Sequence, residues 1–336
     1  MSNRAMPRTV RVIMLGGALL LIAAMSLCLG PTALSVKRSV HAIISGHNTT
    51  EYSILFDIRL PRIILGFAIG GALSLAGVIL QGLFRNPLVE PYTMGISGGA
   101  ALGVSLAIVL KLYRSMGLLT LPFAGFIGAA IVISMIYFIN IRKKTLKIQS
   151  LLLTGVMISF ISSSFIMLIM AVSRTEDLHG IIFWIMGSLE EPSWFLIKVM
   201  LVTSLAGLAL SYIFWKDLNA LRLGEEEATH LGINTERAKR ALFVLASILT
   251  GCAVSVGGII GFVGLIIPHL VRMFIGSDHR ALLVGSFLGG ASFLIFCDTV
   301  ARIIVAPSEL PVGVITGILG GSFFIYALTK KGKSVV

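Results

Sequence analysis

Three residues, Gly95, Ser97 and Gly99, give the chain a G-x-S-x-G pattern, in which a serine hydrolase holds its nucleophile on a sharp turn. Such a turn needs a preceding β-strand and nearby His and Asp partners. Here a Pro-Tyr-Thr sequence comes before the pattern, an apolar span follows it, and no His/Asp pair lies at matching depth. We therefore interpret the pattern as the closely packed start of a membrane helix. A membrane enzyme that uses Ser97 is only the third alternative.

Nucleotide chemistry is suggested by Gly332, Lys333 and Ser334, which resemble the end of a phosphate-binding loop. The full pattern G-x-x-x-x-G-K-[ST] requires glycine at position 327, which is Ala327, and no strand precedes it. We expect no nucleotide site in this chain and no enzymatic activity of its own. ATP-driven work would then come from another subunit.

Metal chemistry finds little support, because no two of the six histidines pair at helical spacing. The three cysteines, Cys28, Cys252 and Cys297, lie inside apolar runs without metal or redox spacing, so we interpret them as packing residues. Carboxylates are rare within the apolar spans, since Glu90 falls in a turn and Asp298 falls towards the outer end of its span. An ion-coupled carrier normally needs such groups inside the membrane.

The composition decides the class of protein. Of 336 residues, 56% are apolar and only 12% are charged, and apolar spans of about 20 residues recur along the whole length. The 36 glycines suit close packing of membrane helices. We predict an all-α polytopic membrane protein, a single transmembrane domain over residues 1–336. The net charge of +12 then reflects topology, and we expect the lipid bilayer as partner, with no nucleic acid.

The apolar runs predict about ten spans. They are 12–36, 63–84, 92–110, 115–141, 148–173, 193–215, 241–271 (a long crossing and a short one), 281–304 and 311–329.

Three segments lie outside these spans. Residues 37–58 read as a polar loop, and residues 174–191 hold an apolar stretch, 179–189, that is too short to cross a bilayer. We expect this stretch to be an external surface helix or loop. The longest polar segment, 216–240, is expected to face a cytoplasmic partner. The residues expected to form structural turns are Asn86, Pro87, Pro91, Pro268 and Pro311.

Charge sets the orientation. With ten spans, two thirds of the 27 Lys and Arg fall on the side that holds both termini, so the positive-inside rule places both termini in the cytoplasm. The first span is too long for a cleaved signal peptide.

A weak internal repeat relates Gly71–Ile79 to Gly251–Ile259. The two copies are an odd number of crossings apart, so they must be inverted, which is typical of transporters. This repeat keeps an ion-coupled secondary transporter open as the alternative function.

Two sets of residues suggest contacts with other proteins. Arg59, Arg62 and Arg302 fall at outer ends of spans, where they either reach the interface for topological reasons or form an exposed cationic rim for an acidic external protein. The stretch Leu223–Gly232 is either a solvated helix or a short helix that seats in a cleft of a cytoplasmic motor.

Several motifs occur together in order: RLPR, LAGVILQGLFRNPLVEPYTMGISGGA, GEEEATHLG, GFVGLIIPHLVR, SDHR, DTVAR and SELPVGVITGILGG. In this respect the chain, over about residues 55–330, resembles the FecCD-type permease of binding-protein-dependent ABC importers for iron-siderophores, haem and cobalamin. The resemblance implies the type II importer architecture in a bacterial or archaeal plasma membrane. It also implies a second copy of the chain, two cytoplasmic ATP-binding subunits that hold ATP and Mg²⁺, and one external substrate-binding protein. The cargo would be a metal chelate, with an iron(III)-siderophore first and cobalamin or haem next.

By the same resemblance, Arg59, Arg62 and Arg302 match the residues that dock the binding protein. The expected ATPase-coupling residues are Leu223, Gly224, Glu225, Glu226, Ala228 and Gly232. The spans at 148–173 and 311–329 would line the path at the dimer axis. The candidates for the pathway or gate are Ser159, Ser162, Ser163 and Thr316.

Overall fold

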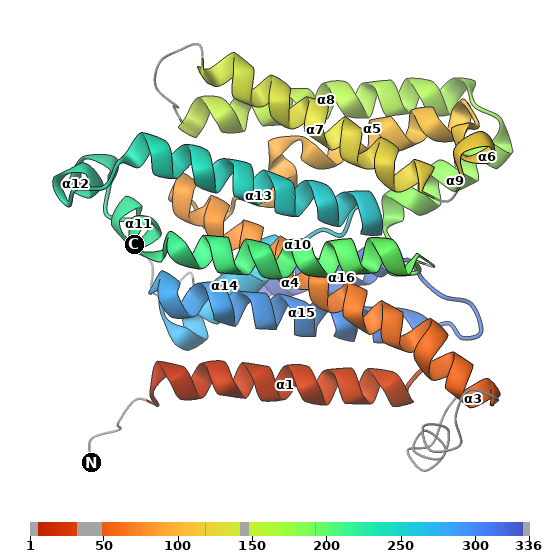
Figure 1. Cartoon of the computed structure of the whole chain (residues 1–336), viewed down its shortest axis with the longest axis horizontal. Coiled ribbons are helices and arrows are strands. Elements are labelled where there is room, and N and C mark those ends of the chain that lie inside the picture. The colour runs from red at the N-terminus through yellow and green to blue at the C-terminus, as the bar shows by residue number, and fades with distance from the viewer. Residues whose placement is uncertain (1–5, 32–48, 118, 142–147, 192, 332–336) are drawn as a thin grey trace.

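Figure 1 shows the computed structural model, which describes residues 6–31, 49–117, 119–141, 148–191 and 193–331. Within these ranges every regular element is a helix. The elements are α1 (Arg8–Cys28), α3 (Thr50–Ser53), η1 (Ile54–Arg59), α4 (Leu60–Phe84), η2 (Pro91–Met94), α5 (Ile96–Val109), α6 (Leu112–Met116), α7 (Thr120–Ile141), α8 (Ile148–Val172), α9 (Thr175–Met186), α10 (Trp194–Ile213), α11 (Trp215–Leu221), α12 (Glu225–His230), α13 (Thr235–Gly257), α14 (Val263–Ile275), α15 (His279–Ile303) and α16 (Val312–Lys331).

The spans expected from hydropathy are confirmed as helices. Seven are long and apolar enough to cross a bilayer, and three shorter apolar helices, α5, α14 and α16, account for the remaining expected spans. The apolar stretch at 179–189 belongs to α9, which has only 12 residues and is too short to cross. The basic cluster at 142–147 and the C-terminal Gly332–Ser334 lie outside the described residues.

Two expected boundaries were wrong. The first helix ends at Cys28 and does not reach residue 36. In addition, residues 50–58 are helical and not a loop, so that α3, the π-helix η1 and α4 form one continuous helix of 35 residues. Thr49 caps its start, since its Oγ1 accepts a hydrogen bond from the Tyr52 amide. The polar residues of this stretch had suggested a loop, because the residue types that cap a helix are also those that favour turns.

Helix α4 is the centre of the bundle. Nearly nine tenths of its apolar window is buried, whereas less than a quarter of the windows in α1, α7 and α8 is buried. It packs against α15, α13, α10 and α14. Glycines allow two of these approaches, because a Cβ atom at Gly70 or Gly77 would overlap the backbone of Gly290 or Gly264 respectively.

The bundle has two ends, named here the α3 end and the α12 end, which lie at the right and left of Figure 1. Helix α1 begins and α16 finishes at the α12 end, so the described chain starts and stops on the same side, as ten spans require. Helix α4 runs from the α3 end to the α12 end, and α13 runs the opposite way. The two repeat-bearing helices are therefore antiparallel, as an inverted repeat demands.

Two interruptions divide helices inside the bundle. Residues 85–95 separate α4 from α5, starting at Arg85 in a left-handed conformation. Residues 258–262 separate α13 from α14, with positive φ angles at Gly258 and Phe262.

Pro268 was expected to help make the second break, and this was wrong, because it lies inside α14. A proline there leaves the carbonyl four residues earlier without its usual donor. That carbonyl, of Gly264, instead accepts a hydrogen bond of 3.2 Å from the buried Gln81 amide.

The glycine contact between α4 and α14 generates a prediction. Gly77→Ala should destabilise the protein by about 2 kcal/mol or more, since its methyl group would meet the Gly264 backbone and not a flexible side chain. Gly17→Ala is the matched control, because nothing lies within 4 Å of its Cβ position in α1. That variant should be neutral or slightly stabilising, since alanine favours helix over glycine. Thermal unfolding of the purified chain in detergent measures both, and equal midpoints would contradict the packing argument.

Candidate functional site

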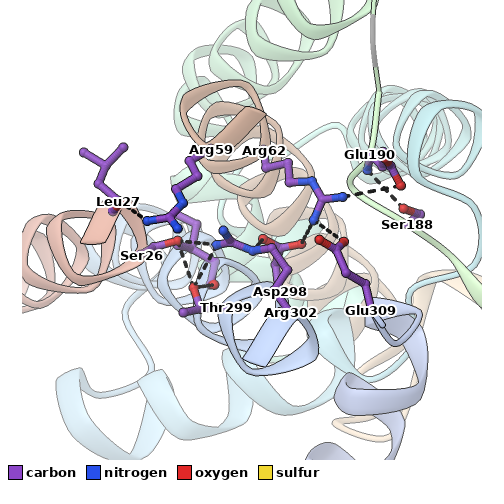
Figure 2. Close-up of polar contacts among 11 residues, drawn as sticks. Ser26, Leu27, Arg59, Arg62, Ser188, Glu190, Asp298, Thr299, Arg302 and Glu309 are labelled. Atoms are coloured by element: carbon purple, nitrogen blue, oxygen red, sulfur yellow. Dashed lines mark hydrogen bonds and ion pairs between the residues drawn. The ribbon is translucent and has the colours of Figure 1, made fainter. Parts of the chain in front are cut away.

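The three arginines expected at span ends do lie together, at the α3 end (Figure 2). Arg59 comes from η1, Arg62 from the first turn of α4 and Arg302 from the last turn of α15. The expectation that they are exposed was wrong: Arg59 and Arg302 are each 2% exposed, and Arg62 is 6% exposed. Their guanidinium groups instead contact polar groups of the same chain.

Arg302 forms the most deeply buried ion pair of this cluster. Its Nε lies 3.0 Å from Oδ2 of Asp298, one helical turn earlier in α15. Its terminal nitrogen donates a 2.8 Å hydrogen bond to the hydroxyl of Ser26 in α1, and Thr299 donates to the same hydroxyl. Figure 2 shows this group of side chains between α1 and α15. Asp298 supplies the counter-charge that a buried guanidinium needs, and the hydrogen bonds to Ser26 join α15 to α1.

Arg59 closes the C-terminal end of α1. Its terminal nitrogen donates a 2.6 Å hydrogen bond to the carbonyl of Leu27, one of the last carbonyls of the helix. A positive charge there is favourable because the end of a helix carries partial negative charge. Gly30 leaves room for the guanidinium, since a Cβ at this position would lie 2.6 Å from Arg59. Arg59 therefore positions α1 directly.

Arg62 is surrounded by three carboxylates. Glu309 lies 2.6 Å away, Glu190 lies 3.4 Å away, and Asp298 lies 4.0 Å away across the cluster. Glu190 belongs to the segment between α9 and α10, and Glu309 to the segment between α15 and α16. Sequence reasoning missed both glutamates. Each precedes a proline closely, in LEEP and SELP, but such a turn signal does not reveal an ionic partner over 100 residues away.

This cluster can recognise a carboxylate but offers no covalent chemistry. Two of the guanidinium groups, those of Arg62 and Arg302, pair with three carboxylates of the same chain, and Arg59 donates to a backbone carbonyl. No nucleophile with an adjacent base occurs among the residues described at the α3 end, and no group of three or more metal-ligating side chains occurs in the described chain. The chemistry that it offers is ion pairing, since guanidinium groups pair well with carboxylates.

The candidate coupling residues lie at the α12 end, as one compact unit. The expected short helix is α12, and it begins after Gly224, whose φ of 144° suits glycine. Ala228 is fully buried, and Glu225 is held by Lys239 of α13 at 2.9 Å. Leu223, Glu226 and Gly232 are exposed, and Leu231, which sequence reasoning did not single out, is 64% exposed.

A second polar cluster connects α11, the helix before α12, to the turn between α14 and α15. Asp278 accepts a 3.0 Å hydrogen bond from the Asn219 amide, caps α15 at the Arg280 amide and pairs with Arg8 of α1. These contacts, the one from Asn219 first, lower the pKa of the Asp278 carboxyl below its usual range. The SDHR motif therefore acts as a joint between α1, α11 and α15.

The pathway candidates are not equivalent in the structure. Ser163 is on the exposed face of α8, whereas Ser162 packs against Gly98 of α5 and is buried. Thr316 is fully buried in α16 and donates to the Gly313 carbonyl, and Ser159 is half-buried. Among them, only Ser163 is exposed.

Ser97 lies in the first turn of α5 after the 3-10 helix η2, so the strand that a hydrolase turn needs is not present there.

The expected turn residues are all at interruptions or helix starts except Pro268. The Asn86 side chain accepts a hydrogen bond from the Leu88 amide, Pro91 opens η2, and Pro311 precedes α16, while Pro87 follows the end of α4.

Glu90 and Tyr92 were not expected to act together. Glu90 accepts a hydrogen bond from the Phe262 amide at 2.5 Å, and the Tyr92 hydroxyl accepts from the Ile260 amide at 3.0 Å. The first interruption therefore holds the second.

Comparison with known proteins places this arrangement among transporters. The model of the FecCD transport family matches residues 18–330. The hemin transport system permease protein HmuU of Yersinia pestis is 40% identical over 98% of both chains. The cobalamin import system permease protein BtuC of Halobacterium salinarum is 39% identical over 84% of this chain and 75% of its own. A solved structure described as an inward-facing conformation of a metal-chelate type ABC transporter matches with a TM-score of 0.83 at 31% identity, covering 96% of this chain and 99% of its own.

The buried pair at the α3 end generates a prediction about stability. Asp298→Ala should destabilise the protein by about 3 kcal/mol, because it leaves the Arg302 guanidinium buried without its counter-charge. Asp57→Ala removes an exposed carboxylate from η1 and should change stability by about 0.5 kcal/mol or less. Thermal midpoints in detergent give the comparison. Equal decreases in the thermal midpoints of the two variants would mean that the Asp298–Arg302 pair does not contribute to stability.

Proposed function

This chain belongs to the FecCD transport family, and we propose that it carries a bulky metal chelate across the plasma membrane by alternating access, powered by a separate ATPase. It is a permease of a metal-chelate, haem or cobalamin type ABC importer and an integral membrane protein. The observation that carries the proposal is the near full-length match to the family and to transporter permeases, together with a fold of transmembrane helices.

The proposed assembly contains two copies of this chain, two cytoplasmic ATP-binding subunits with ATP and Mg²⁺, and one external binding protein. The exposed leucines at α12 support the cytoplasmic contact, because Leu223 and Leu231 are 66% and 64% exposed at a polar end of the bundle. Clustered apolar side chains on such a surface are typical of a protein interface. The exposed faces of α8 and α16 are the candidates for contact with the second copy.

In this proposal the α12 end faces the cytoplasm and the α3 end faces outwards, with both termini inside. The excess of Lys and Arg on the α12 side supports this orientation. The external protein would dock at the α3 end by carboxylates that reach Arg62. Arg59 and Arg302 would contribute by positioning α1 and α15, because their guanidinium groups are engaged with Leu27 and Asp298.

The cargo is proposed as a class. Identities of 40% to a hemin permease and 39% to a cobalamin permease do not separate these two ligands. Iron(III)-siderophore systems are frequent in the family, so we keep an iron(III)-siderophore as the proposed cargo. The match to the hemin permease covers more of the chain than the match to the cobalamin permease, so haem is the first ligand to test. A passage that bound its cargo tightly would slow its release, so we expect specificity to reside mainly in the external protein.

An ion-coupled secondary transporter is the alternative, and Glu90 is the observation that favours it. This carboxylate lies inside the bundle at the start of α14, where a cation or proton could bind. Its hydrogen bond from the Phe262 amide gives it a structural role as a cap, which favours the importer.

Reconstitution separates the two functions. Proteoliposomes that hold this chain with its ATPase and binding protein should take up haem, cobalamin or a ferric siderophore only with ATP and Mg²⁺, and a protonophore should not change the rate. The chain alone, under a proton or sodium gradient, should transport nothing. Uptake by the chain alone would overturn the importer proposal.

A second prediction addresses the cytoplasmic contact. Leu231→Ser should lower ATP-dependent uptake at least about threefold by weakening contact with the ATPase, while the thermal midpoint stays unchanged because the side chain is already exposed. Leu110→Ser is the matched control: this leucine is equally exposed, at 64%, and lies at the α3 end. Co-purification of the ATPase and the uptake rate are the measurements. Equal rates for wild type and both variants would exclude Leu231 from the contact.

A further inference from the structure

Arg62 differs from its two neighbours in what holds it. Arg302 is paired with the buried Asp298, and Arg59 donates to a carbonyl of α1. Arg62 is held at 2.6 and 3.4 Å by Glu309 and Glu190, whose side chains are 35% and 76% exposed. A buried guanidinium thus has its main partners at the protein surface. Figure 2 shows the two glutamates on one side of Arg62, away from Arg59 and Ser26.

The two glutamates lie on the segments that precede α10 and α16. Glu190 is two residues from Ser188, whose amide donates to the carbonyl of Gly257 at the end of α13. Glu309 lies shortly before α16, whose Val312 amide donates to the Gly187 carbonyl. Arg62 therefore joins the segment after α9 to the segment before α16.

We propose that Glu190 and Glu309 are internal competitors for Arg62, which a carboxylate of the external binding protein displaces when it docks. This inference rests on the proposed function and adds a mechanism to it. Docking puts one external carboxylate in the place of two internal ones, so the Arg62 guanidinium keeps a counter-charge throughout. The exchange removes the ionic contacts that the two segments make with Arg62 and leaves the backbone hydrogen bond from Val312 to Gly187 in place. The signal then reaches the starts of α10 and α16 without any change at the buried Asp298–Arg302 pair.

The energetics favour exchange at Arg62 over exchange at Arg302. Glu190 and Glu309 are 76% and 35% exposed, so they return to water when they leave Arg62, and the incoming carboxylate keeps the guanidinium paired. Asp298 is buried, and breaking its pair would leave the Arg302 guanidinium buried without a counter-charge. Glu190 and Glu309 can therefore be replaced readily, and Asp298 cannot. Before the exchange, the negative charges of Glu190 and Glu309 also repel the acidic surface of the approaching binding protein. Neutralising the two glutamates should therefore strengthen docking.

Arginine labelling tests the competition without any partner protein. Phenylglyoxal modifies accessible guanidinium groups, and mass spectrometry of chymotryptic peptides reads each arginine separately. In the full-length chain in detergent, Glu190→Gln with Glu309→Gln should raise labelling of Arg62 at least about threefold. Arg59 and Arg302 serve as internal references and should not change. Glu176→Gln, an exposed carboxylate in α9, is the matched control and should leave all three unchanged.

Poly-L-glutamate is the probe for the incoming carboxylate. It should protect Arg62 from labelling in the double variant more strongly than in the wild type, since the internal competitors are gone. Unchanged labelling of Arg62 in the double variant, or labelling that poly-L-glutamate does not reduce, would overturn the proposal. Each single variant is also measured. If the thermal midpoint shows that the double variant is misfolded, labelling of Arg62 in the single variants still tests the proposal.

The assembled importer supplies the second arm. Docking of its external binding protein should tighten about threefold to tenfold in the double variant, and weaker or unchanged docking would overturn the competitor role. This failure differs from failure of the proposed function. ATP-dependent uptake by the wild type establishes the importer independently, and the labelling experiment needs no transport at all.

Discussion

Backbone amide and carbonyl groups inside a bilayer must find partners within the protein, because no water is there to replace them. The two interrupted helices are where this constraint is hardest to meet. Glu90 and Tyr92 accept from the amides of Phe262 and Ile260, and Gln81 donates to the carbonyls of Gly264 and Leu265. All three side chains come from the first half of the chain and serve the second half. The breaks in the helices therefore interlock the two halves, and the close glycine contacts of α4 bring them near enough to do so.

The two ends of the bundle use charge differently. At the α12 end, Lys239 holds α12, and Asp278 holds the turn before α15, so the exposed leucines project from a firmly attached unit. At the α3 end, the buried Asp298–Arg302 pair lies beside the partly exposed Arg62–Glu309 pair. In the proposed importer, the chain transmits force at one face and receives a partner at the other. A rigid attachment suits the first task, and replaceable ion pairs suit the second.

Hydropathy predicts most of this fold, because a span of apolar residues that must cross a bilayer has few other structures available. It fails where polar residues continue a helix, as at residues 50–58, since Thr49 and Glu51 can cap a helix or form a loop. Placing Arg59, Arg62 and Arg302 near one another was within reach of the sequence, but their burial was not. Burial depends on Ser26, Asp298 and Glu309, which reach the arginines only after α1, α15 and the segment before α16 have packed.

Helix α1 lies at the edge of the bundle and is fastened at both ends. Arg8 and Arg11 attach it to Asp278 and to the Phe274 carbonyl, and Leu27 is held by Arg59. Only about a tenth of its apolar window is buried. A single helix normally tilts to match a membrane of different thickness, but one fixed at both ends cannot do so alone. We therefore expect lipids around α1 to stretch or compress instead, which makes this edge of the permease the part most sensitive to acyl-chain length.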